Sequence, residues 1–253
     1  MSAIFRPFSR NDFVPDAESP DTPNILVLFD IDGTLVDCGS AAGKCFAAAF
    51  RRVFGVPCPK FSGREISGLT DAAILSLVLQ RVEVTGDSSQ RRRDLFALYA
   101  DELASTLART PPTALPGARE AVEKVQSLAG CAAGLLTGST LATARIKLEF
   151  AGIDFRQFVC GAFSEDGERR ELLPPVARAR FAESLGCAPD LTVLVGDTPR
   201  DGEAARMTGC KFIGVATGHY DAPTLFAAGA RAVFADLSDT GSFCQAISGL
   251  ARV

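Results

Sequence analysis

Two aspartates directly follow an apolar run near the start of the chain. The segment 24–36, NILVLFDIDGTLV, places Asp30 and Asp32 just before Gly33 and Thr34. Side chains at i and i+2 of a strand project to the same side, so both carboxylates are expected at the carboxyl end of one buried strand. At that distance they repel, and one must be protonated or a cation must lie nearby. A D-x-D pair by itself is also typical of an ordinary solvated strand end.

Two further apolar runs end in polar residues of the same kind. Residues 131–136 lead into Thr137, and residues 191–195 lead into Asp197 and Asp201. In an open parallel sheet with helical crossovers, the carboxyl ends of the strands lie along one edge, where such folds bind their ligands. A hydroxyl group and four carboxylates are therefore expected to converge at that edge.

Helical and strand patterns alternate along the chain. This alternation predicts an α/β fold with a doubly wound, Rossmann-like parallel sheet. The predicted helices cover residues 39–54, 71–82, 89–109, 116–128, 140–151, the stretch that follows Pro174 and Pro175 up to Leu185, and 201–208; later strands are predicted at 212–216 and 232–234.

The composition of the chain excludes several classes of protein. With 253 residues, of which 47% are hydrophobic, the chain can bury a large core. The net charge of −4 provides no basic field for nucleic acid. Eight cysteines without a C-x-x-C pair argue against a zinc or redox motif and fit a reducing compartment, so a cytoplasmic location is expected. A single histidine, His219, excludes phosphatases built on clustered imidazole ligands.

Neither a secretory signal nor a membrane span is predicted. Residues 1–23 contain no continuous apolar stretch and are expected to form a flexible N-terminal extension. The longest charge-free stretch, residues 125–144, contains several glycines and is typical of a strand that turns into a helix. We therefore expect no membrane partner.

Three short segments together resemble a known family. DIDGTLVD, LLTGST and GDTPRD resemble motifs one, two and four of the haloacid dehalogenase (HAD) superfamily, in its phosphatase branch that includes phosphoglycolate phosphatases and β-phosphoglucomutases. The resemblance covers nearly everything after residue 23. It implies a catalytic core at 24–38 and 113–253, with an α-helical cap domain inserted at 39–112.

The resemblance also implies roles for the paired acids. Asp30 would attack phosphorus and form an aspartyl phosphate, and a carboxylate needs no deprotonation to do so. Asp32 would protonate the leaving oxygen and then activate water. Relatives that attack carbon lack this second acid, so Asp32 favours a phosphate ester over a haloacid as substrate.

A magnesium site and a phosphate site follow from the same resemblance. Mg²⁺ would be held by Asp30, by the main-chain carbonyl of Asp32 and by Asp197. Asp201 would orient Asp197 or a water molecule, or would act only as a helix cap. The Thr137 hydroxyl would bind a phosphoryl oxygen, aided by the backbone N–H of Gly138.

The third motif departs from the family pattern. Relatives usually carry a lysine before a proline, whereas this chain has no lysine between 147 and 211. Arg169 and Arg170 are the candidates for the missing phosphate-binding cation. Helix register favours Arg170, and the R-x-E-L pattern of some relatives favours Arg169. The other arginine would lie in a solvated charged loop.

Three residues of the predicted cap are candidate substrate contacts. Thr70 and Asp71 lie in a G-x-T-D stretch that faces the active site in relatives, with helix capping as the alternative role. Lys44 could approach the phosphate from the first cap helix. Its segment GSAAGKC is not a P-loop, because it has three residues between the glycines and a cysteine where Ser or Thr is needed.

The sequence therefore predicts a Mg²⁺-dependent phosphatase that acts on a small phosphorylated metabolite through an aspartyl-phosphate intermediate. A phosphosugar mutase and a catalytically silent phosphate-binding protein are the alternatives. A phospho-acceptor receiver is disfavoured because receivers lack a long insertion after the first strand. Neither the identity of the phosphoester nor the oligomeric state follows from the sequence.

Overall fold

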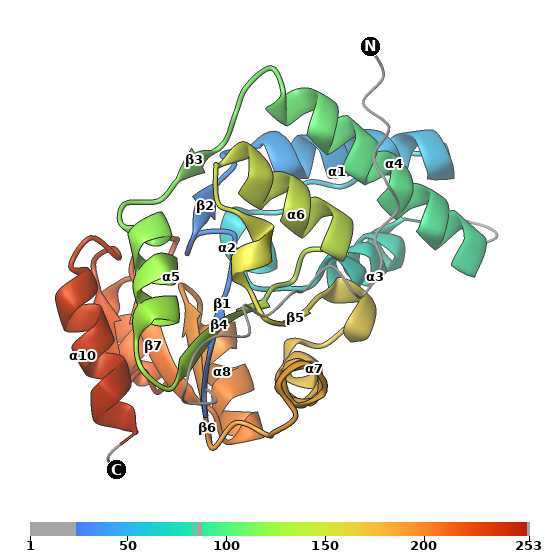
Figure 1. The fold of residues 1–253 in the computed structure, drawn as a ribbon. Helices are drawn as coiled ribbons and strands as arrows, with labels where there is room; N and C mark the ends of the chain where they lie inside the picture. The colour runs from blue at the N-terminus through green and yellow to red at the C-terminus, as the bar shows by residue number, and fades with distance from the viewer. Residues whose placement is uncertain (1–23, 83, 85–87, 252–253) are drawn as a thin grey trace.

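A parallel sheet of six strands organises the molecule. The computed structural model describes residues 24–82, 84 and 88–251, so the predicted extension at 1–23 lies outside the described residues. The strand order is β5-β4-β1-β6-β7-β8 (Figure 1). Its strands are β1 (Ile25–Phe29), β4 (Cys131–Leu136), β5 (Gly161–Ala162), β6 (Leu191–Gly196), β7 (Lys211–Val215) and β8 (Ala232–Phe234). The predicted doubly wound α/β fold is confirmed.

The central strand β1 is paired in parallel with β4 on one side and β6 on the other. Phe29 is in register with Leu135 of β4 and Val195 of β6. The three strands that precede the sequence motifs are therefore neighbours, and their carboxyl ends lie level. This register brings residues more than a hundred positions apart to one edge.

Helices cover both faces of the sheet, and side chains of β1 alternate between them. Val27 and Phe29 pack with residues of α5, α6 and α10, whereas Leu26 and Leu28 pack with α7, α8 and α9. The bounds of these helices are α5 (Ala118–Ser127), α6 (Leu141–Phe150), α7 (Leu173–Leu185), α8 (Pro199–Thr208), α9 (Ala222–Ala227) and α10 (Thr240–Leu250). Short 3₁₀ turns are η2 (Phe155–Gln157), η3 (Ser164–Asp166) and η4 (Arg170–Leu172).

Helix α7 begins at Leu173, slightly before the predicted start. Pro174 and Pro175 lie inside its first turn. Proline is tolerated there because the first N–H groups of a helix have no partner within it. The two prolines therefore belong to the helix and do not precede it.

Four helices leave the sheet as one insertion between β2 (Val36–Asp37) and β3 (Thr113–Ala114), which form an antiparallel pair. They are α1 (Ala41–Phe54), α2 (Gly63–Ile66), α3 (Asp71–Arg81) and α4 (Ser89–Leu107), and we call them the helical insertion. It has a separate hydrophobic core that includes Phe50, Leu75 and Leu103. Figure 1 shows α1 and α4 side by side at the end of the molecule opposite α10.

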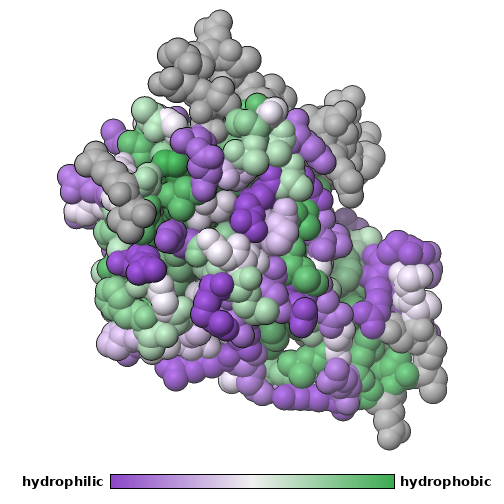
Figure 2. All heavy atoms as spheres, turned by 90° about the horizontal axis from the view of Figure 1, so that it is seen from below, coloured by the Kyte–Doolittle hydropathy of each residue, from purple (hydrophilic) through white to green (hydrophobic). Residues whose placement is uncertain are grey.

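Most large apolar side chains of the described residues are buried in these three cores. The exposed ones are Leu172, Met207 and Phe226. On the face shown in Figure 2, hydrophilic and hydrophobic side chains are interspersed. None of the helices in the described part of the chain is both long enough and apolar enough for a membrane span.

Candidate active site

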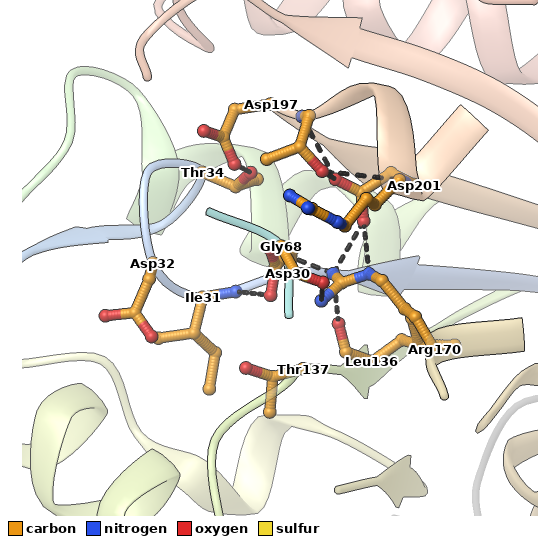
Figure 3. Close-up of polar contacts among 12 residues, drawn as sticks. Asp30, Ile31, Asp32, Thr34, Gly68, Leu136, Thr137, Arg170, Asp197 and Asp201 are labelled. Atoms are coloured by element: carbon orange, nitrogen blue, oxygen red, sulfur yellow. Dashed lines mark hydrogen bonds and ion pairs between the residues drawn. The ribbon is translucent and has the colours of Figure 1, made fainter. Parts of the chain in front are cut away.

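The three motif strands deliver Asp30, Thr137 and Asp197 to one place. Each residue directly follows its strand, and their exposed fractions are 4%, 1% and 2%. Figure 3 shows Thr137 and Asp197 on either side of Asp30. Polar groups this deeply buried need partners or a bound ligand, because their desolvation costs free energy. The sheet edge is therefore the candidate active site.

Three buried carboxylates form an acidic cluster at this edge. One oxygen from each of Asp30, Asp197 and Asp201 lies within 4.8 Å of the others. Burial raises the pKa of Asp30 to about 6, and the nearby Arg170 partly opposes this. Burial, together with the charges of Asp30 and Asp201, raises the pKa of Asp197 well above its usual value. Burial therefore disfavours a negative charge on Asp30 and Asp197 unless a cation lies beside them.

Asp201 is already occupied by protein partners. Its Oδ1 accepts a hydrogen bond of 2.8 Å from Nε of Arg170, and its Oδ2 accepts bonds of 3.0 and 2.6 Å from the backbone N–H and hydroxyl of Thr198. The bonds with Thr198 complete a capping box at the start of α8. Asp201 is thus the third helical residue of a capping box whose N-cap is Thr198, and it also orients an arginine.

Asp30 and Asp197 are the members of the cluster suited to a metal ion. Among the described residues, the hydroxyl of Thr34 donates a hydrogen bond to Oδ1 of Asp197, at a long 3.4 Å. Mg²⁺ prefers carboxylate oxygens and completes its shell with water and substrate, so two buried carboxylates at one sheet edge fit this ion. The chemistry of the donor set is therefore right for Mg²⁺.

Arg170 brings a buried positive charge to Asp30. Its Nη2 lies 2.9 Å from Oδ2 of Asp30 and 2.6 Å from Oδ1 of Asp201, and its side chain is 5% exposed. Arg169 instead has a side chain that is 69% exposed and pairs with Glu171 at 3.2 Å. Of the two arginines singled out from the sequence, Arg170 lies in the site and Arg169 lies outside it.

Asp32 does not share the surroundings of Asp30. Its Oδ2 accepts hydrogen bonds from Nζ of Lys147 at 2.5 Å and from the hydroxyl of Ser139 at 3.0 Å. Strand alternation is therefore not what positions the two carboxylates, although the charge of Asp32 still contributes to the raised pKa of Asp30. Strand β1 ends at Phe29, and Asp32 lies in the following turn. Each acid therefore has its own cation.

Sequence reasoning missed Lys147, although a signal was present. The predicted helix at 140–151 places Thr140, Thr143 and Lys147 on one helical face, and all three are buried. A lysine on the buried face of a helix requires a nearby acid. The residue was overlooked because it belongs to none of the motifs.

The comparisons with known proteins agree with this geometry. The family model described as Haloacid dehalogenase-like hydrolase matches residues 27–215. The chain belongs to this family. It is 26% identical over 236 residues to the probable phosphatase IndB of Dickeya dadantii, covering 88% of this chain and 94% of that protein. It is also 28% identical over 207 residues to a phosphoglycolate phosphatase of Chromobacterium violaceum, covering 79% and 88%.

A solved structure matches the fold of this haloacid dehalogenase-like hydrolase over most of its length. The crystal structure of a hydrolase from Pseudomonas syringae superposes with a TM-score of 0.67 at 22% identity. The match covers 88% of this chain and 98% of that one. The predicted membership of the HAD superfamily is confirmed.

In this HAD-like hydrolase, the loop before α3 joins the helical insertion to the sheet edge. The Thr70 hydroxyl donates to the carbonyl of Glu168 at 2.6 Å, and the backbone N–H of Asp71 donates to the carbonyl of Gly138 at 2.7 Å. The Asp71 carboxylate accepts from the N–H of Thr140 at 3.1 Å. Thr70 and Asp71 thus connect insertion and core in the hydrolase, and Thr70 also caps α3.

The same loop covers the site directly. The carbonyl of Gly68 accepts a hydrogen bond from Nη1 of Arg170 at 3.4 Å. A Cβ on Gly138 would lie 2.2 Å from the carbonyl oxygen of Leu69, so this close approach requires glycine. Lys44, by contrast, is exposed on α1 and forms no ion pair with a described residue. The structure does not bring it to the acidic cluster.

A glycine after β7 was also missed by sequence reasoning. A Cβ on Gly218 would lie 1.8 Å from Oδ2 of Asp197, closer than any side chain allows. The neighbouring Thr217 hydroxyl donates to the carbonyl of Gly33. The turn after β7 therefore packs against the first motif of the hydrolase. His219, in the same turn, is a loop residue, as expected.

Proposed function

We propose that this HAD-like hydrolase is a Mg²⁺-dependent phosphatase that hydrolyses a small phosphomonoester through an aspartyl phosphate on Asp30. One observation carries the proposal: Asp30 is buried at the end of β1, with Oδ2 held 2.9 Å from Nη2 of Arg170 and Asp197 beside it. A carboxylate fixed between a cation and a cation-binding acid is suited to attack an anionic phosphorus centre. The relatives named as phosphatases support the same reaction.

The first step transfers the phosphoryl group to the enzyme. A carboxylate oxygen of Asp30 forms a bond to phosphorus as the bond between phosphorus and the leaving oxygen breaks. Asp32 donates a proton to that leaving oxygen. The Thr137 oxygen accepts a hydrogen bond of 3.2 Å from the N–H of Ser139, so its own O–H is available to bind a phosphoryl oxygen. Gly138 contributes its backbone N–H to the same group.

The second step releases inorganic phosphate. Water attacks the phosphorus of the aspartyl phosphate, the bond to Asp30 breaks, and Asp32 accepts the proton of the water. Both carboxylates return to their starting states. Arg170 neutralises charge on Asp30 and on the transferred group in both steps. We infer that the helical insertion acts as a cap, because its loop at 68–71 lies against the site.

Asp30, Asp197 and the main-chain carbonyl of Asp32 would hold Mg²⁺. The ion supplies positive charge that reduces repulsion between the phosphate oxygens and the carboxylates. Asp201 contacts Arg170 and Thr198, so in this proposal it holds Arg170 in position and does not bind the ion.

The substrate we propose is a small phosphorylated metabolite. Because one relative is named phosphoglycolate phosphatase, compounds of that size are the first to test. A phosphosugar mutase would use the same two acids, but it would convert one phosphate ester into its isomer. Product analysis separates these reactions, since a phosphatase releases free phosphate from a single ester and forms no isomer.

The test is a phosphate-release screen over a panel of phosphorylated metabolites with Mg²⁺ present. Wild type is expected to release phosphate from at least one compound, and Asp30→Asn serves as the blank because its amide is not a nucleophile. Acid quenching of the wild type during turnover should trap phosphate on Asp30. Equal release by wild type and Asp30→Asn contradicts the proposal, as does isomer formation without phosphate release.

A further inference from the structure

A lysine outside the four motif segments is buried where α6 meets the helical insertion. Lys147 is 2% exposed, and its Nζ lies 2.5 Å from Oδ2 of Asp32 and 2.8 Å from the hydroxyl oxygen of Ser139. The Ser139 hydroxyl donates to the same Oδ2 at 3.0 Å. Burying an ammonium group is costly unless its partners compensate. Lys147 and Ser139, in turn, both contact the acid assigned to proton transfer.

The two oxygens of Asp32 differ in their surroundings. Oδ2 accepts hydrogen bonds from both Lys147 and Ser139, whereas Oδ1 accepts no hydrogen bond from a described residue. The side chain of Asp32 is 44% exposed. Figure 3 shows its carboxylate directed away from Arg170 and Asp201. One oxygen is thus anchored, and the other is open to exchange a proton.

The anchor itself is held on a rigid element. Helix α6 packs against α4 of the helical insertion, and its first residues are held by Asp71 through the N–H of Thr140. On the same helix, Arg145 pairs with Glu149 at the surface, with side chains 33% and 38% exposed. That surface pair has the character of an ordinary helix ion pair. The buried pair reaches across 115 residues of sequence to the first motif.

We propose that Lys147, assisted by Ser139, is a positioning residue that orients the Asp32 carboxylate for proton donation to the leaving oxygen. This role rests on the proposed phosphatase function. The ammonium group of Lys147 and the hydroxyl of Ser139 hold Oδ2 of Asp32 in one place. Fixing Oδ2 also directs Oδ1 to the reacting oxygen. Loss of Lys147 therefore acts on the step in which the leaving group departs.

The test compares two substrates of similar shape whose leaving groups differ in how strongly they depend on protonation. The p-nitrophenolate ion leaves readily without a proton, whereas the more basic phenolate ion depends on protonation. The measured quantity is kcat/KM, which reports events up to departure of the leaving group. Lys147→Met is expected to lower kcat/KM about tenfold more for phenyl phosphate than for p-nitrophenyl phosphate. Ser139→Ala should show the same selectivity to a smaller extent.

A double-mutant cycle with Asp32 shows whether Lys147 positions that acid or only stabilises the fold. In an Asp32→Asn background, Lys147→Met should cause little further loss for either substrate, because the group it orients is already gone. Arg145→Met, on the same helix, is the matched control and should change both substrates equally and slightly. Urea unfolding of each variant shows whether the fold is retained, and Ser139→Ala carries the test if Lys147→Met does not fold.

The outcomes distinguish this role from the proposed function. Equal losses for the two substrates, or a full further loss in the Asp32→Asn background, would overturn the role of Lys147 and leave the phosphatase function standing. Absence of phosphate release by wild type from every compound, including both aryl phosphates, would overturn the two together.

Discussion

Nη2 of Arg170 lies 2.9 Å from Oδ2 of Asp30, so this buried carboxylate has a buried guanidinium as its immediate neighbour. The same nitrogen lies 2.6 Å from Asp201. The guanidinium thereby links the first, third and fourth motif segments. An arginine has enough donors to contact both acids, which a compact ammonium would do less well.

Replacing Arg170 by alanine is expected to lower kcat for phosphate release at least about 100-fold, because a buried donor to the reacting carboxylate is lost. It should also lower the free energy of unfolding by about 3–5 kcal/mol, since Asp30 and Asp201 stay buried without their cation. Steady-state kinetics and urea unfolding measure the two effects. Arg169→Ala is the matched control and should stay within about twofold, because its ion pair is exposed. Similar losses in both variants would contradict the assignment.

Removal of divalent cations by EDTA is expected to abolish phosphate release, and added Mg²⁺ should restore it. Asp197→Asn should lose Mg²⁺ binding in isothermal titration calorimetry, because it removes charge from a site of few ligands. Asp154→Asn removes an exposed carboxylate and serves as the control. Full activity in EDTA, or unchanged Mg²⁺ binding by Asp197→Asn, would exclude the proposed metal site.

Gly218→Ala is expected to reduce kcat about 100-fold, since its Cβ would lie 1.8 Å from Oδ2 of Asp197 and would force that carboxylate to move. Mg²⁺ affinity should fall with it. Gly43→Ala adds the same methyl group on α1, where no heavy atom lies within 4 Å, and should leave both quantities unchanged. If the two alanine variants behave alike, the turn after β7 does not define the position of Asp197.

Asp71 should make stability depend on pH. Burial raises its pKa from 3.8 to about 6, opposed by Lys147 and the N–H of Thr140. The folded state therefore keeps a proton that the unfolded chain releases. The stabilisation is fully present below pH 3.8 and is lost as the pH rises through about 6.

The free energy of unfolding of Asp71→Asn should therefore rise relative to that of wild type between pH 4.5 and 7.5, by about 2 kcal/mol. Urea unfolding at the two pH values measures this difference. Asp101→Asn, which removes an exposed carboxylate, is the control. A wild-type to Asp71→Asn difference that is the same at both pH values would show that folding does not raise the pKa of Asp71.

Long apolar runs made the sheet predictable. The strands expected at 131–136 and 232–234 coincide with β4 and β8, and the run ending at Asp30 forms β1. A parallel strand covered on both faces must be continuously apolar, so it stands out in a sequence. The two-residue strands β2, β3 and β5 did not stand out, because periodicity needs longer segments.

The sequence by itself determined that Asp30, Thr137 and Asp197 meet, because each follows a buried parallel strand and such strands end along one edge. Only the tertiary structure selected Arg170 over Arg169, since adjacent residues with the same side chain differ in which one is buried against the acids. It alone revealed that Lys147 holds Asp32. Burial and pairing of charge depend on elements far apart in the chain, and local patterns of residues do not encode that proximity.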